Sequence, residues 1–173
     1  MAQTLQTLAP TVVFAVLGTT RKRAAREQMA AREAYERIDF GLTAMLLTAS
    51  ERCGSSPRFV YVSAAGLSPT TSNPYMQVRV RVEALLAEGS LPFLVGRPSF
   101  IVGDRDEARP AERWGARIAD GALGVAGVLG AKRAAARYRS TTNETLGEAL
   151  VTLALDPNTP ARHTAESEDL RGA

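Results

Sequence analysis

A tyrosine and a cation stand four residues apart where a predicted helix begins. Asn73 and Pro74 close a loop, and Tyr75 and Arg79 follow in a run that is predicted to be helical to about Glu88. Residues four apart share a helix face, so the phenol of Tyr75 and the guanidinium of Arg79 can point the same way. A tyrosine with a pKa of about 10 needs a neighbouring cation to exchange a proton at neutral pH. The pair is therefore a candidate proton donor.

A serine at the end of a strongly apolar run is the second candidate. The run from Phe59 to Val62 is uncharged and consists of β-branched and aromatic residues, which predicts a strand buried on both faces of a parallel sheet. Ser63 ends this strand, and the small residues from Ala64 to Gly66 keep its carboxyl end open. Ligands of open α/β sheets bind at that end of the strands. The sequence therefore predicts a ligand site where Ser63 lies.

Four short motifs occur in a fixed order along the chain. They are Leu17-Gly18-Thr19-Thr20-Arg21, Ser63-Ala64-Ala65-Gly66, Pro74-Tyr75-Met76-Gln77-Val78-Arg79, and Arg97-Pro98 followed by Gly103-Asp104-Arg105 and Arg109-Pro110. Together they resemble the short-chain dehydrogenase/reductase superfamily, whose pattern is Ser and Tyr-x-x-x-Lys, and within it the atypical Tat-interacting-protein-like branch. Two positions depart from that pattern. Arg79 stands where the family has lysine, and Ala64 stands where relatives often carry a second serine.

The resemblance implies an NAD(P)-dependent oxidoreductase with a small-molecule carbonyl substrate. In that interpretation Tyr75 gives a proton to the carbonyl oxygen, Ser63 orients the carbonyl and Arg79 supplies the positive charge. Because only charge and reach are then required at position 79, we expect Arg79→Lys to preserve or raise any activity. The cofactor, NADP or NAD, would contact Gly18, Thr19, Thr20, Arg21, Arg97 and Pro98. The alternative is a non-catalytic binding or regulatory protein that retains only the carboxyl-terminal part of the fold.

The elements that position these residues alternate between strands and helices. Parallel strands are predicted at residues 11–17, 59–62 and 91–98, and helices at residues 3–8, 21–49, 75–88 and 144–155. A pocket wall is predicted at residues 100–103, a turn at 104–110, a glycine-interrupted helix at 111–135, an extended piece at 137–139 and a short strand after Asp156. The alternation predicts an α/β fold with a parallel sheet.

The start of the sequence bears on cofactor binding. A dinucleotide-binding fold begins with a strand, a glycine-rich turn and a helix whose amino terminus holds the pyrophosphate. Only ten residues precede Thr11, whereas the missing strand-helix units would need about 70 at roughly 30 residues each. We therefore expect a single, partial Rossmann-like domain over residues 1–173, truncated at the amino terminus and starting at the fourth strand. Nicotinamide dinucleotide should bind it weakly or not at all.

Composition argues against several other classes. The 21 basic and 18 acidic residues are too evenly balanced to demand nucleic acid, and glutamates alternate with the arginines of residues 21–36 as on an ordinary solvated helix. Cys53 and His163 are the only residues of their types, so we expect neither an internal disulfide nor a metal site. A cytoplasmic protein fits this cysteine usage. No run approaches the roughly 18 apolar residues of a membrane helix, so no membrane partner is expected.

Two further features allow more than one interpretation. Asp39 occupies a region where many members of the wider superfamily have an Asn or Asp that orders the active site, although an exposed helical aspartate is equally compatible with the sequence. The strand at residues 11–17 has the composition of a doubly buried centre, yet it would become an edge if three strands are missing. Such an apolar edge lacks the charges that prevent strand pairing. We therefore expect a homodimer through this first strand, or aggregation.

Overall fold

The computed structural model describes residues 1–102 and 141–171. The predictions for residues 103–140 lie outside this part. The described elements are α1 (Ala2–Leu8), β1 (Val12–Ala15), α2 (Arg21–Arg26), α3 (Ala31–Ala34), the π-helix η1 (Tyr35–Leu42), α4 (Thr43–Glu51), β2 (Arg58–Val62), α5 (Pro74–Glu88), β3 (Phe93–Arg97), β4 (Ile101–Val102), β5 (Thr141–Thr142), α8 (Asn143–Leu155), β6 (Arg162–Glu166) and the 3₁₀ helix η2 (Asp169–Arg171).

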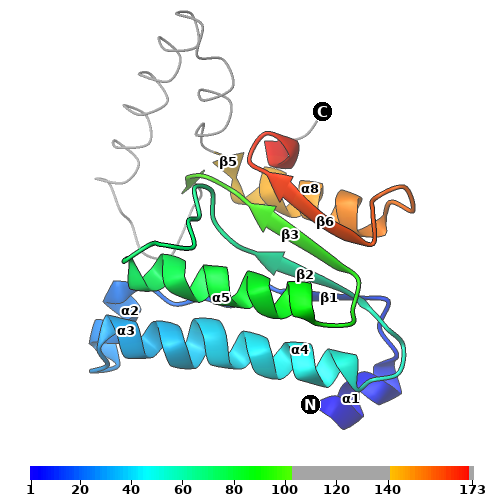
Figure 1. Cartoon of the computed structure of the whole chain (residues 1–173), viewed down its shortest axis with the longest axis horizontal. Coiled ribbons are helices and arrows are strands. Elements are labelled where there is room, and N and C mark those ends of the chain that lie inside the picture. The colour runs from blue at the N-terminus through cyan, green and yellow to red at the C-terminus, as the bar shows by residue number, and fades with distance from the viewer. Residues whose placement is uncertain (103–140, 172–173) are drawn as a thin grey trace, which may run out of the picture.

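The four main strands form one parallel sheet in the order β1-β2-β3-β6, which confirms the predicted fold class. Helices η1, α4 and α5 cover one face of the sheet, and α8 covers the other (Figure 1). The second strand is its buried centre, because Phe59, Val60 and Tyr61 have no exposed surface. Burying an apolar side chain of this size stabilises a fold by about 1.5–3 kcal/mol. A second, two-stranded sheet joins β4 to β5.

Alternation along β2 divides the core between the two faces. Phe59 and Tyr61 pack with the residues of α4 and α5, whereas Val60 packs with those of α8. Helix α8 approaches β3 closely at Gly96, where an added Cβ would lie 2.8 Å from Cδ2 of Leu150. A side chain at position 96 would therefore force Leu150 to move. The same alternation turns Ser63, directly after β2, toward α5.

The long helix predicted at residues 21–49 is broken. It consists of α2, α3, η1 and α4, with Gln28 at a φ of +53° between the first two pieces. In η1 the hydrogen bonds run from residue i to i+5, so side chains no longer repeat at the α-helical spacing. Leu42 and Met45 have the spacing of an apolar face if residues 21–49 form one regular α-helix, yet they are 39% and 52% exposed, while Asp39 is fully buried. The π-helix thus brings a carboxylate into the core.

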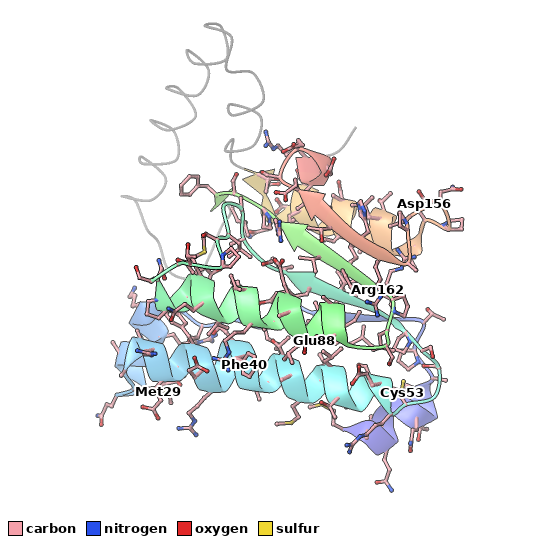
Figure 2. All side chains as sticks on the ribbon, in the orientation of Figure 1. Met29, Phe40, Cys53, Glu88, Asp156 and Arg162 are labelled. Atoms are coloured by element: carbon pink, nitrogen blue, oxygen red, sulfur yellow. The ribbon has the colours of Figure 1, made fainter. Side chains whose placement is uncertain are left out.

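Both ends of α5 are fixed by side chains. At its start the Oδ1 atom of Asn73 accepts a hydrogen bond of 3.0 Å from the backbone N–H of Tyr75, a typical N-cap. At its end Arg162 of β6 donates to the carbonyl oxygens of Ala87 and Gly89. Figure 2 shows the arginine beside the last turn of the helix. A helix held at both ends keeps Tyr75 at a fixed position relative to the sheet.

Candidate active site

The guanidinium of Arg79 lies among two tyrosines and an aspartate, which we call the Arg79 cluster (Asp39, Tyr61, Tyr75 and Arg79). Its NH1 atom donates a hydrogen bond of 2.7 Å to the hydroxyl of Tyr61, and its NH2 atom donates one of 3.1 Å to Oδ1 of Asp39. The carbon at its centre lies 4.7 Å from the ring centroid of Tyr75. Arg79 therefore contacts Tyr75 through the face of the ring, at a distance typical of a cation–π interaction.

The Arg79 cluster also reaches the turn that follows β1. The second carboxylate oxygen of Asp39 accepts a hydrogen bond of 2.9 Å from the backbone N–H of Thr19. A Cβ built on Gly18 would lie 3.4 Å from Oδ1 of Asp39 and 3.5 Å from NH2 of Arg79. Of the predicted cofactor-binding residues, Thr19 is therefore hydrogen-bonded to the Asp39–Arg79 ion pair and Gly18 lies beside it. Asp39 joins this turn to the helix that carries Tyr75.

Burial determines the electrostatics of the cluster. It raises the pKa of Asp39, although Arg79 and the N–H of Thr19 oppose the shift. It raises the pKa of Tyr61 to about 12, again opposed by Arg79. Burial also disfavours the charge of Arg79, but its interactions with Tyr61, Tyr75 and Asp39 outweigh that cost, and its pKa is raised. A buried cation with these partners is held strongly in its charged form.

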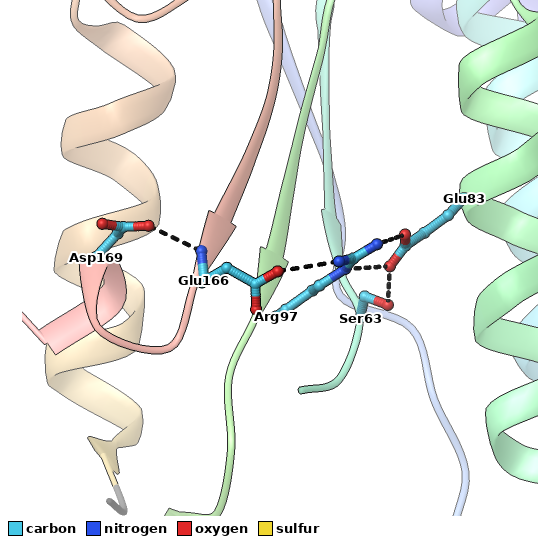
Figure 3. A network of polar contacts seen from close by, with 5 residues as sticks. All are labelled: Ser63, Glu83, Arg97, Glu166 and Asp169. Carbon is cyan, nitrogen blue, oxygen red and sulfur yellow. Dashed lines mark hydrogen bonds and ion pairs between the residues drawn. The ribbon is translucent and has the colours of Figure 1, made fainter. Parts of the chain in front are cut away.

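A second group of polar residues ties together the carboxyl ends of three strands. The hydroxyl of Ser63 donates a hydrogen bond of 2.5 Å to Oε1 of Glu83. The guanidinium of Arg97 donates hydrogen bonds of 3.1 and 2.5 Å to the two oxygens of the same carboxylate. The guanidinium of Arg97 also donates a hydrogen bond of 3.0 Å to Oε1 of Glu166 (Figure 3). We call these four residues the Arg97 network. The positive charge of Arg97 lies between the carboxylates of Glu83 and Glu166, so this charge is locally neutralised.

The structure therefore separates the predicted site residues into two groups. Tyr75 and Arg79 lie together with Gly18 and Thr19, whereas Ser63 and Arg97 meet at Glu83. Glu83 follows Tyr75 by eight residues, which is about 12 Å along the axis of α5 at 1.5 Å per residue. The hydroxyl of Ser63 is thus anchored about two helical turns from the tyrosine.

The remaining predicted residues have local structural contacts. Thr20 is the N-cap of α2, because its hydroxyl accepts from the N–H of Arg23 at 3.1 Å. Arg21 is the first residue of that helix. Pro98 is buried, and its carbonyl oxygen accepts from the N–H of Ala65 at 2.9 Å. The cofactor roles of these three residues stay predictions.

Sequence reasoning did not select Tyr61, Glu83 or Glu166. Tyr61 lies in the most apolar strand, where a tyrosine is indistinguishable from a core aromatic. Glu83 resembles any surface glutamate of a helix, and Glu166 is 69 residues beyond its partner Arg97. A weak signal existed for Glu83 alone, since it falls two helical turns after Tyr75 and so on a related face of α5.

These features define a class of protein. A parallel sheet with flanking helices and polar residues at its carboxyl edge is a Rossmann-like α/β fold. The structure is similar to that of RMD from Pseudomonas aeruginosa, solved in complex with NADPH. The match has a TM-score of 0.56 and 21% sequence identity, and it covers 89% of this chain and 60% of the RMD chain. It is also similar to the structure of dTDP-4-dehydrorhamnose reductase from Bacillus anthracis in complex with NADP. That match has a TM-score of 0.50 and 14% sequence identity, and it covers 99% of this chain and 72% of the reductase chain.

Sequence comparison identifies more specific relatives than the fold does. The chain is 34% identical over 115 residues to protein HTATIP2 of Rattus norvegicus and 31% identical over 120 residues to mitochondrial protein FMP52 of Coccidioides immitis. These matches cover 65% and 69% of this chain, and 43% of each relative. The predicted resemblance is confirmed: FMP52 and HTATIP2, which are atypical short-chain dehydrogenase/reductase proteins, are homologues of this chain.

Three further findings delimit this assignment. The chain spans less than half the length of these relatives. No family model matches the sequence. Within residues 1–102 and 141–171, none of the helices has the length and apolar character needed to cross a bilayer. The names of the fungal relatives refer to mitochondria, so a cytoplasmic location for this chain stays a prediction.

Proposed function

We propose that the chain carries the substrate-side half of an NAD(P)-dependent reductase site, with Tyr75 as proton donor to a small carbonyl compound. The observation that supports this most directly is the contact between Tyr75 and Arg79 at the start of α5. Tyr75 is half-buried, and the buried guanidinium of Arg79 lies 4.7 Å from its ring centroid. A tyrosine held next to a permanent charge, on the side of the sheet where ligands bind, is suited to proton transfer.

The residues fit a nicotinamide dinucleotide only in part. The strand-turn-helix unit that carries the predicted cofactor residues is β1–Gly18–α2, and α2 has only six residues. The N–H of Thr19 is bonded to Asp39 and the hydroxyl of Thr20 caps α2, so neither is directed toward a phosphate. Gly18 is exposed and lies beside the Arg79 cluster. This arrangement suits the nicotinamide end of the cofactor better than its pyrophosphate.

The chain's own residues then have distinct tasks. When bound, the reduced nicotinamide would supply the hydride. Tyr75 would hold and release the proton, and Arg79 would keep positive charge beside its ring. Ser63 could orient a carbonyl only by releasing Glu83, since its hydrogen is donated to that carboxylate. We therefore assign the proton to Tyr75 alone and regard Ser63 as a secondary contributor.

A reductase assay tests this proposal. Loss of NADPH absorbance should be measured at high nucleotide concentration with a panel of small aldehydes and ketones. The proposed role predicts that Tyr75→Phe nearly abolishes any turnover, by about 10²–10⁴-fold, because it removes the proton donor and keeps the ring. Arg37→Gln is the matched control, as it removes an exposed arginine that pairs with Glu33.

The same assay separates the alternative function. A non-catalytic binding or regulatory protein would show no turnover that depends on Tyr75. The anchoring of the Ser63 hydroxyl on Glu83 is the observation that favours this alternative. Equal rates in the wild-type chain and Tyr75→Phe would remove Tyr75 from the mechanism and leave the binding role as the better interpretation.

A further inference from the structure

The hydrogen bonds of Arg79 fix the plane of its guanidinium. One terminal nitrogen donates to Tyr61 and the other to Asp39, and the two acceptors come from β2 and η1 respectively. The guanidinium carbon lies 4.7 Å from the centroid of Tyr75 and 5.5 Å from that of Tyr61. These two hydrogen bonds therefore hold the guanidinium at its place over the ring of Tyr75.

Both acceptors are rigid. Tyr61 and Asp39 have no exposed surface, and Asp39 is held in turn by the N–H of Thr19. Tyr75 is also contacted from another direction by Tyr35, whose ring is edge-on at a centroid distance of 5.6 Å. The ring of Tyr75 is therefore confined between a cation and an aromatic edge. Its orientation depends on groups that cannot move to solvent.

We propose that Tyr61 is a positioning residue, which together with Asp39 holds the Arg79 guanidinium over the ring of Tyr75 and thereby sets the direction of the Tyr75 phenol. The functional part of this inference rests on the proposed role of Tyr75 as proton donor. It also explains why arginine stands at position 79. A guanidinium offers a planar fork that can satisfy two acceptors and stack on a ring at once, whereas an ammonium is a point charge.

Fluorine NMR on the chain labelled with fluorotyrosine tests the positioning directly and without any activity. The chain has four tyrosines, and the Tyr75 resonance is identified by its loss in Tyr75→Phe. Tyr61→Phe keeps the buried ring and removes the acceptor, so the Tyr75 resonance should shift. In an Arg79→Met background the same Tyr61→Phe change should leave that resonance where Arg79→Met alone puts it, because the link between the two tyrosines is already lost.

Arg81→Gln is the matched control. Arg81 is also on α5 and its guanidinium is stacked on a ring, 3.9 Å from the centroid of Phe40, but it belongs to a different pair with Glu36. This change should leave the Tyr75 resonance unmoved. If Tyr61→Phe does not fold, Arg79→Lys replaces it, and the same shift is expected. An unchanged Tyr75 resonance in whichever of the two variants folds would overturn the proposal.

Kinetics then separate the positioning role from the proposed function. If the chain reduces carbonyls, Tyr61→Phe should lower kcat by about ten- to a hundredfold and leave the KM for nucleotide unchanged, since a small misplacement of a reacting group has that effect. Absence of all reductase activity would contradict the proposed function and leave the NMR result standing. Normal kcat in Tyr61→Phe, with a shifted resonance, would contradict the link between positioning and chemistry.

Discussion

The hydroxyl of Ser63 donates a hydrogen bond of 2.5 Å to the carboxylate of Glu83, which joins the end of β2 to α5. The same carboxylate holds Arg97 from β3, and the side chains of Glu83 and Arg97 are 15% and 27% exposed. Ser63 thus contributes to the packing of three elements. This contact explains how a residue predicted to act on substrate can have a structural role as well.

Glu83→Gln should reduce the free energy of unfolding by about 1–3 kcal/mol, because it weakens a charge-assisted bond to a partly buried arginine. Urea unfolding measures this. Glu36→Gln is the control, since its pair with Arg81 is 41% and 47% exposed and should contribute only about 0–1 kcal/mol. Equal effects of the two changes would mean that the Arg97 network has no special stability.

Tyr61 should give the protein a distinctive instability at high pH. Its pKa in the folded chain is about 12, and an unfolded tyrosine titrates at about 10. The folded state keeps its proton longer, so this contribution to stability is fully present below a pH of about 10 and is lost as the pH rises toward about 12. The loss should amount to about 3 kcal/mol at most. Urea unfolding of Tyr61→Phe should lack this decline, and parallel pH profiles of the two proteins would contradict the interpretation.

Arg79→Lys should destabilise the folded chain, whatever its effect on activity. A lysine can keep the charge but cannot bond Tyr61 and Asp39 in one plane while it stacks on Tyr75. We expect a loss of about 1–3 kcal/mol in thermal or urea unfolding, because one buried acceptor is left unpaired. Arg37→Lys, in an exposed pair with Glu33, should be nearly neutral. Wild-type stability in Arg79→Lys would show that charge alone is required.

Binding of NADPH and NADH by this chain should be weak or absent. The turn after β1 has its N–H at Thr19 and hydroxyl at Thr20 engaged within the protein, and Arg97 is neutralised by two carboxylates. A few contacts at the nicotinamide end do not offset the cost of ordering a flexible dinucleotide. Calorimetric titration with each nucleotide checks this, and a dissociation constant in the low micromolar range would refute it.

We propose that β1 mediates self-association. Among the strands that the structure describes, β1 is the terminal one of its sheet, it contains no charged residue, and Phe14 on it is 40% exposed. Unpaired strands of this kind pair with one another unless a charge interrupts them. Light scattering should therefore find dimers or aggregates, and Phe14→Lys should reduce them. Leu155→Lys on α8, at a residue that is 65% exposed, is the control and should not. A monomeric wild-type chain with a cooperative thermal transition would contradict the proposal.

Strong local patterns made most of the fold predictable. The uncharged run at Phe59 to Val62 became the central strand, and Asn73 with Pro74 marked the start of α5 to within a residue. The helix predicted at residues 144–155 is α8, which begins one residue earlier at Asn143. The short strand expected after Asp156 is β6, paired with β3. In each case a local preference and the tertiary structure agree.

The π-helix and the polar contacts were not predictable. The spacing of Leu42 and Met45 assumed an α-helical period, which η1 does not keep, so both side chains are exposed and Asp39 is buried. The sequence left open whether Asp39 is exposed or functional, and only its contacts with Thr19 and Arg79 decide that it is internal. Pairs such as Arg97 and Glu166 depend on the order of strands, which no local pattern encodes.

The last strand of the sheet also governs the order in which the protein can mature on the ribosome. Strand β6 covers the outer edge of β3, although its residues are synthesised 69 positions later. Until Arg162 and Glu166 have been synthesised, the end of α5 lacks the hydrogen bond from Arg162, and Arg97 lacks its ion pair with Glu166. Among the strands that the structure describes, β3 therefore keeps an open edge until β6 is synthesised. Premature termination upstream of β6 would release a species that can pair with another chain through β3.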